Sequence, residues 1–251
     1  MIIDPSYRLA DINLLDNSWK CPVDWRLDHQ VNNYSNWKKY DMAWRPEIWG
    51  NAYDGLKLGA HFNGDYFGYK HQLEFTAWYN SGLGQGLLYE PSFSNVSGDL
   101  NEDLTDAYNP FNFDLNYKTA TDNFLPNSNF FLNSGVLDGV FAFETGFEKK
   151  LGDNNRDKIA VYVKDLYFFN TMYLYNRELI GANKNNSVNI DYAHQYNYFK
   201  GSGTVNVNFR SNDLLSDYNF SRINVEAINN TRLGKFDLKT RYFIQWGSGS
   251  D

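Results

Sequence analysis

The sequence lacks the features on which several common protein classes depend. Cys21 is the only cysteine, so no intramolecular disulfide can form and a disulfide-stapled secreted domain is excluded. No run of about 18 apolar residues is present, which argues against a transmembrane helix. The first residues, MIIDPSYRLADINLL, have neither the basic segment nor the continuous apolar segment of a signal peptide.

Positive charge is also scarce. The chain has 23 Lys and Arg residues against 30 Asp and Glu residues, giving a net charge of −7 and no basic cluster. Such a surface would repel the phosphate backbone of DNA or RNA. We therefore expect no nucleic-acid partner.

Motifs for catalysis and metal binding are missing as well. The chain contains no HExxH, CxxC, GxSxG or phosphate-binding glycine loop. The acidic segment Asp99–Asp106 begins like a calcium loop but lacks the turn glycine and the final glutamate. The histidines lack the spacing of ligands: His29, His61, His71 and His194. The sequence predicts no catalytic residue, no metal ligand and no cofactor.

What the chain does contain is strict alternation of apolar and polar residues. Aromatic residues make up 18% of a chain whose mean hydropathy is only −0.59. In residues 236–246 the mostly apolar set Phe236, Leu238, Thr240, Tyr242, Ile244 and Trp246 alternates with Asp237, Lys239, Arg241 and Gln245. The same period of two near the N-terminus places Val23, Trp25, Leu27, His29 and Val31 opposite Asp24, Arg26, Asp28 and Gln30. This period predicts β-strands with one apolar and one hydrated face.

The alternating segments are long for a soluble sheet. Soluble strands usually have about 5–6 residues, whereas a tilted strand needs about 9–11 to cross a membrane. We predict strands at 22–31, 40–49, 55–62, 69–79, 111–118, 136–148, 157–168, 187–198, 204–210, 218–229 and 235–246, with a further strand within 119–135. The sequence thus predicts an all-β fold, an antiparallel outer-membrane-type β-barrel with Arg26, Asp28, Lys57 and Glu74 facing a hydrated lumen.

Turn residues separate these segments. The sequences Gly152–Asn155, Lys200–Gly203 and Asn229–Gly234 favour tight turns, whereas 80–110, 119–135 and 170–186 predict longer loops. Short turns combined with long loops are typical of outer-membrane barrels.

The segment around Asn63-Gly64 allows a prediction of register. A two-residue turn there would place Phe62 opposite Asp65 and Leu58 opposite Tyr69. The apolar residues of the two strands, among them Leu56, Leu58, Leu73 and Phe75, would then share one face, and His61 and His71 would lie on opposite faces.

The most distinctive stretch, residues 44–59 (WRPEIWGNAYDGLKLG), has the residues of a strand ending at an aromatic belt. Together with RLADI at 8–12, HFNGDY at 61–66, YKH at 69–71, WYNSGLGQ at 78–85 and INNTRLGK at 228–235, it resembles the C-terminal region of M1-type (gluzincin) metallopeptidases of Bacteroidota. In that family a barrel-like domain similar to the Omp85/surface-antigen barrels follows the peptidase. The resemblance spans nearly the whole chain.

The resemblance implies a role without chemistry in this chain. The family's zinc-binding HExxH is absent, so no catalytic residue is transferred. Residues 1–20 would form a connector and residues 21–251 the barrel strands and loops, incomplete at the C-terminus. We expect a fragment of a longer protein that anchors an upstream peptidase in cis, with the lipid bilayer of the bacterial outer membrane as its other partner.

Two alternatives from other classes remain. A soluble, secreted β-sandwich could bind glycans through exposed Trp and Tyr side chains, but it needs shorter strands and rings buried between two sheets. A β-rich hydrolase would require two acids with shifted pKa values converging in one cleft.

Overall fold

The computed structural model describes residues 14–15, 20–28, 36–51, 55–82, 110–152, 154–169, 184–212 and 215–250. These residues form twelve β-strands and no helix. The strands are β1 (Val23–Leu27), β2 (Tyr40–Asn51), β3 (Gly55–Tyr66), β4 (Lys70–Asn80), β5 (Phe111–Ala120), β6 (Ser128–Leu137), β7 (Val140–Leu151), β8 (Asp157–Phe168), β9 (Lys184–Tyr198), β10 (Gly201–Asn212), β11 (Asn219–Leu233) and β12 (Phe236–Ser250). The predicted all-β fold is confirmed.

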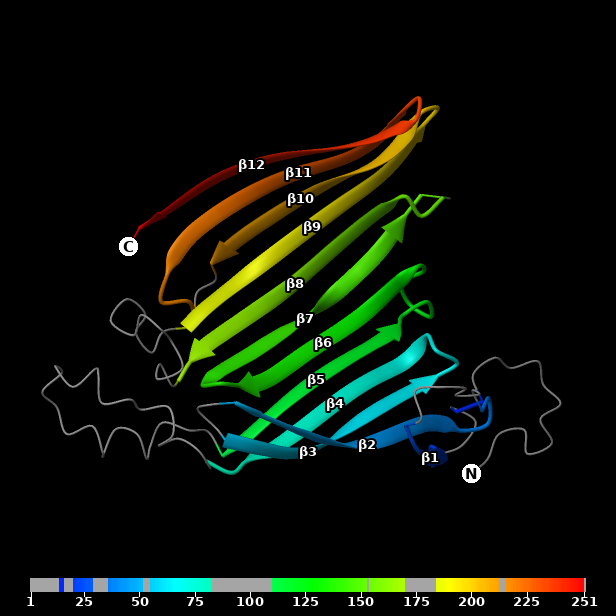
Figure 1. Ribbon diagram of the computed structural model, residues 1–251, viewed down its shortest axis with the longest axis vertical. Helices are drawn as coiled ribbons and strands as arrows, with labels where there is room; N and C mark the ends of the chain where they lie inside the picture. The colour runs from blue at the N-terminus through cyan, green and yellow to red at the C-terminus, as the bar shows by residue number, and fades with distance from the viewer. Residues whose placement is uncertain are drawn as a thin grey trace, which may run out of the picture. The chain divides into compact units, whose positions relative to one another are not determined.

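The strands form one sheet in chain order, each hydrogen-bonded to its sequence neighbours (Figure 1). Pairing is antiparallel through β2–β5 and through β8–β12. The first pair differs from the prediction, because β1 runs parallel to β2, with Val23 opposite Tyr40 and Leu27 opposite Trp44. Among the described residues no pairing joins β1 to β12, so the sheet is not closed. Closure into a barrel stays a prediction.

The strand expected within 119–135 is present as β6, which extends further than predicted. The predicted strand 136–148 contains the end of β6 and most of β7, because the chain turns between them at Asp138 and Gly139. These two residues have φ values of 49° and 77°. An Asp-Gly pair with positive φ at both residues is typical of a type I′ hairpin turn, a signal that the alternation had masked.

The turn between β3 and β4 does not lie where the sequence predicted it. Asn63 and Gly64 belong to β3, and the chain turns at residues 67–69, where Phe67 and Gly68 have φ values of 56° and 70°. Gly64 instead makes room for a neighbour, because a Cβ there would lie 2.5 Å from the hydroxyl of Tyr40. The glycine is needed for close packing rather than for a turn.

The predicted register of this hairpin is therefore wrong, but its faces are right. Leu58 lies opposite Tyr79 and Phe62 opposite Phe75, instead of opposite Tyr69 and Asp65. The observed partners on β4 differ from the predicted ones by an even number of residues, so each side chain stays on the face that was predicted for it. Leu58 and Phe75 share one face of the sheet, as predicted.

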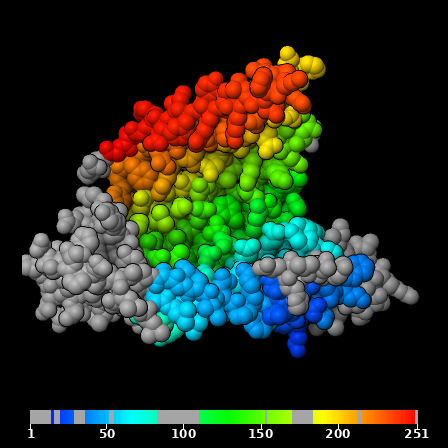
Figure 2. Space-filling model, viewed as in Figure 1, coloured from blue at the N-terminus to red at the C-terminus, as the bar shows by residue number. Residues whose placement is uncertain are grey.

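Internal contacts divide the chain into two compact units. Unit 1 comprises residues 1–119, 134–140 and 170–179, and unit 2 comprises residues 120–133, 141–169 and 180–251. In Figure 2 the visible surfaces of β9 to β12 in unit 2, coloured from yellow to red, follow one another as bands.

In both units the connections differ between the two ends of the strands. In unit 1 residues 67–69 join β3 to β4 at one end, whereas at the other end β4 stops at Asn80 and β5 begins at Phe111. In unit 2 residues 199–200 and 234–235 join β9 to β10 and β11 to β12, whereas β8 stops at Phe168 and β9 begins at Lys184. Short connections also occur at the end with the longer ones, since residues 52–54 join β2 to β3 there and the Asp138-Gly139 turn contacts Lys57 there. The longest connection of each unit lies at one end of its strands, as the long loops of outer-membrane barrels do.

None of the described residues belongs to a helix long and apolar enough to cross a membrane. Several predictions lie outside the described residues, namely those on His29–Val31 and on the acidic segment Asp99–Asp106. Of the predicted connector, Leu14 is buried and its backbone N–H donates to the hydroxyl of Tyr66 in β3 at 3.1 Å.

Candidate functional site

Unit 1 has an apolar face whose side chains are exposed. Ile48 is 67% exposed and lies opposite Leu58, which is 48% exposed. The cross-strand registers place one further set of exposed apolar side chains on this face: Val23, Trp25, Leu27, Trp44, Leu56, Tyr79 and Phe111. Both the composition and the exposure of this face agree with the sequence pattern.

Unit 2 has an apolar face of the same kind. A cross-strand row runs from Val161 through Ile190, Phe209 and Ile223 to Trp246 on β8 to β12. Every member of the row is at least 36% exposed. The row therefore crosses five consecutive strands without a covering layer among the described residues.

The opposite, polar face is the more buried one. In unit 1 it carries Asp41, Lys57, Thr76, Asn80 and Asn112, none of which is more than 7% exposed. In unit 2 the polar-face residues Ser187 and Asn189 of β9 are buried, while Val188 and Ile190, which alternate with them along the strand, are exposed. Burial is thus inverted relative to a soluble protein, in which apolar side chains are the buried ones.

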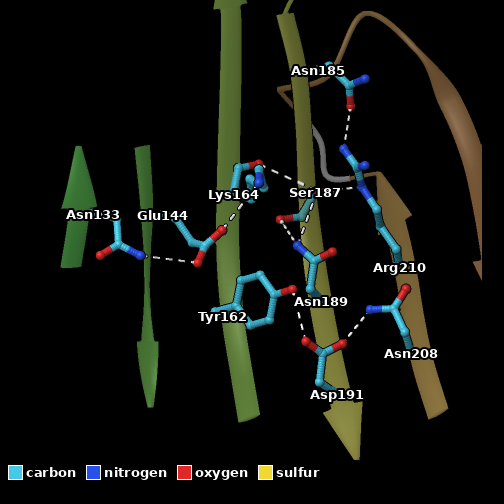
Figure 3. Close-up of polar contacts among 10 residues, drawn as sticks. All are labelled: Asn133, Glu144, Tyr162, Lys164, Asn185, Ser187, Asn189, Asp191, Asn208 and Arg210. Carbon is cyan, nitrogen blue, oxygen red and sulfur yellow. Dashed lines mark hydrogen bonds and ion pairs between the residues drawn. The ribbon is translucent and has the colours of Figure 1, made fainter. Parts of the chain in front are cut away.

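Ion pairs and hydrogen bonds connect the polar face of unit 2 (Figure 3). Glu144 on β7 accepts a hydrogen bond from the Asn133 amide at 3.3 Å and pairs with Lys164 of β8 at 3.3 Å. Asp191 on β9 accepts from the Tyr162 hydroxyl at 3.1 Å and from the Asn208 amide. Each carboxylate therefore links neighbouring strands and satisfies partly buried polar groups.

Arg210 of β10 lies on the same polar face, and its guanidinium is directed toward β9 (Figure 3). Its Nε donates to Ser187 Oγ at 3.1 Å, and one terminal nitrogen donates to Asn185 Oδ1 at 2.9 Å. The Asn189 amide donates to the same Ser187 Oγ at 3.2 Å. The guanidinium is held in place by two neutral acceptors on β9.

The polar face of unit 1 carries its own ion pairs. Arg45 lies 2.6 Å from Asp28 and 3.7 Å from Glu47. Lys57, which is fully buried, contacts Asp138 at 3.0 Å. The four residues predicted to face a hydrated interior, Arg26, Asp28, Lys57 and Glu74, all lie on this face.

The histidines are distributed over both faces. His61 contacts Thr76 on the polar face, with Nδ1 2.7 Å from Oγ1, whereas His71 contacts the Tyr117 hydroxyl on the apolar face. Their predicted separation is confirmed. Among the described residues no three His, Cys, Asp or Glu side chains are grouped as a metal site would require.

Aromatic side chains gather where β9 reaches its short turn. On the apolar face His194, Tyr196 and Tyr198 stack in succession with ring centroids 6.2 and 6.3 Å apart. The Tyr198 hydroxyl donates to Asn229 Oδ1 at 3.0 Å. Rings that combine an apolar body with a hydrogen-bonding tip suit a membrane–water interface.

Cys21 lies just before β1 and is exposed. Partial burial nevertheless raises the pKa of its thiol above the ordinary value. A raised pKa leaves less thiolate near neutral pH, which is the opposite of what a cysteine nucleophile needs.

Sequence analysis missed one feature of unit 2. Residues of β9 to β12 line a cavity of about 470 Å³ that is open to solvent, and Arg210 and Arg222 are both among its lining residues. The available signal was an arginine at a polar-face position of each of two neighbouring strands, followed by Gly247 and Gly249 on the next strand.

Comparison with protein-family models, curated proteins and solved structures gives no match for this chain.

Proposed function

We propose that this chain forms the membrane-embedded wall of an outer-membrane-type β-barrel, or a portion of one. Its apolar face contacts lipid, and its polar face lines a hydrated interior. The observation that carries the proposal is the inverted burial, in which Ile48 is 67% exposed while Lys57 is fully buried. Lipid covers the outer side chains of such a barrel, so exposed apolar residues there are stabilising rather than costly.

The extent of the exposed apolar surface supports this proposal. A soluble monomer rarely exposes a contiguous apolar patch of more than about 300–600 Å². The row from Val161 to Trp246 crosses five strands, and Ile159, Val163, Val188, Tyr192, Val205, Val207 and Val225 lie on the same face beside it. The glycan-binding sandwich would need two sheets with aromatic side chains packed between them. The described strands instead form one sheet, on which Tyr192, Phe209 and Trp246 of this face are exposed.

The anchoring role is a second part of the proposal and rests on the family resemblance of the sequence. The barrel wall would hold an upstream M1-type metallopeptidase at the bacterial outer membrane and would itself perform no chemistry. The distribution of the ion pairs agrees with this role, because Lys164 with Glu144 and Arg45 with Asp28 are partnered within the wall.

Membrane fractionation tests the first part. The chain, expressed in the protein to which it belongs and carried to the outer membrane, should remain in the membrane pellet after alkaline washing and should dissolve only with detergent. A folded, monomeric chain in buffer without detergent would contradict the proposal. The second part depends on the reading frame upstream of Met1, where an HExxH motif is expected and where its absence would remove the peptidase partner.

A further inference from the structure

The cavity in unit 2 brings two like charges together. Arg210 of β10 lies directly opposite Arg222 of β11 in the antiparallel register, and both side chains are on the polar face. Like charges at directly opposed positions destabilise a sheet. Among the described residues no carboxylate forms an ion pair with either guanidinium, so their repulsion is not offset within the described chain.

The donors of this arginine pair are only partly used. Arg210 is held by Ser187 and Asn185, which occupy two of its five N–H groups. The Nε of Arg222 is buried and has no hydrogen-bond partner. A buried donor without a partner costs free energy, and the cost is larger for a charged group.

Glycines on β12 create the space beside these donors. Gly247 lies opposite Arg222 and Gly249 opposite Phe220, both on the polar face, where any other residue would place a side chain. A Cβ at Gly247 would lie 3.6 Å from Cγ of Arg222. The Phe220 ring also lines the cavity, with the Arg210 guanidinium 5.1 Å from its centroid.

We propose that this cavity binds an oxyanion, namely the phosphate or carboxylate group of a small water-soluble organic molecule. Paired guanidinium groups present forked donors that match phosphate and carboxylate oxygens. The volume of about 470 Å³ exceeds that of a bare ion and lies within the range of small-molecule sites. Gln245, which also lines the cavity, adds an amide that can bind the neutral part of the ligand.

The site goes beyond the proposed barrel function and does not depend on it. The same cavity would bind its ligand in a membrane wall or in a water-soluble sheet, because all of its lining residues belong to unit 2. Failure of anion binding would therefore leave the membrane proposal intact, and the reverse also holds.

Calorimetric titration of the full chain, folded in an uncharged detergent without phosphate, tests the inference. The probes are inorganic phosphate and glucose 6-phosphate, with glucose as the neutral comparison. Both phosphates should bind at one site per chain, glucose 6-phosphate should bind more tightly, and glucose should not bind. Binding of neither phosphate would overturn the inference, as would an equal affinity for glucose.

Three variants and one control assign the binding to this cavity. Arg222→Gln and Arg210→Gln should each weaken glucose 6-phosphate binding by at least about tenfold, since each removes a charged donor. Gly247→Val keeps both charges but fills the space beside Arg222, and it should also abolish binding. Lys239→Gln removes one positive charge from the exposed part of the same face of β12 and should leave the affinity unchanged.

The controls keep each outcome decisive. Circular dichroism and thermal unfolding identify any variant that fails to fold. Gly247→Val tests loss of the cavity without loss of charge, and Lys239→Gln tests loss of charge outside the cavity. A loss of affinity in Lys239→Gln equal to that in Arg222→Gln would show general charge attraction and overturn the site. Anionic lipid vesicles added to the detergent sample provide the remaining comparison, and a response to lipid headgroups without one to glucose 6-phosphate would also overturn it.

Discussion

Replacement of Val161 by arginine distinguishes lipid from water at the apolar face of unit 2. Val161 is 48% exposed, lies within β8 between Ile159 and Val163, and is opposite Ile190. On a water-soluble sheet, arginine at a position this exposed would change the free energy of unfolding by no more than about 0.5 kcal/mol. Near the middle of a bilayer the same change should cost about 2–4 kcal/mol.

The two outcomes differ enough to be measured. A cost of about 2–4 kcal/mol lowers the folding equilibrium constant by roughly 30-fold to 900-fold. The assay is reversible unfolding of the chain in lipid vesicles by guanidinium chloride, followed by tryptophan fluorescence.

A depth control is available on the same face. Leu233 is 52% exposed at the end of β11, beside the short turn to β12. Because the cost of arginine falls to about 0–1 kcal/mol near the membrane interface, Leu233→Arg should be nearly neutral. Equal effects of Val161→Arg and Leu233→Arg would refute the proposal that Val161 lies within a membrane.

Three further predictions concern packing, the polar network and topology. Gly203→Ala should destabilise the fold by about 1–3 kcal/mol in the same unfolding assay, because a Cβ there would overlap the Tyr196 ring and lie 2.7 Å from the Ile228 carbonyl oxygen. Gly247→Ala should cost less, because the atom nearest to a Cβ there is 3.2 Å away. A larger loss of stability in Gly247→Ala than in Gly203→Ala would contradict this packing. Asp191→Ala should destabilise by about 0.5–1.5 kcal/mol for each hydrogen bond lost, namely those from Tyr162 and Asn208, whereas Asp191→Asn should retain part of that stability. Equal stability of the alanine variant and the native chain would count against a stabilising role of this partly buried network. Cys21 lies at the strand ends of unit 1 that carry the turn at residues 67–69, opposite the ends joined by the long connection 81–110. It should react with a bulky maleimide only after the outer membrane is permeabilised, at a rate that is low near neutral pH and rises with pH because its thiol pKa is raised. Ser81→Cys in a Cys21→Ser background, at the opposite strand ends, should react in intact cells, and labelling of Cys21 in intact cells would contradict this topology.

Alternation of side chains allowed the faces of the sheet to be predicted. The period of two depends only on strand geometry, so Leu238, Tyr242 and Ile244 could be assigned to the apolar face before any partner strand was known. The buried polar residues Ser187 and Asn189 follow the same rule on β9.

Register could not be predicted in the same way, because it depends on where the chain turns. Asn63-Gly64 has the composition of a tight turn, but Gly64 lies in β3 under the Tyr40 ring. Asp138-Gly139 is a real turn within a segment that looked like one continuous strand. The same limit applies to the proposed anion site, since only the register places Arg222 between Arg210 and Gly247.

Spin-label scanning of β9 in lipid vesicles tests most directly whether the exposed apolar face meets lipid. Single labels at positions 188 to 192 are compared for collision with oxygen, which concentrates in hydrocarbon, and with a polar nickel chelate, which stays in water. Positions 188, 190 and 192 should favour oxygen and positions 189 and 191 the chelate, because the side chains alternate between the two faces. Preferential collision with the chelate at positions 188, 190 and 192 would place the apolar face in water and contradict the membrane assignment.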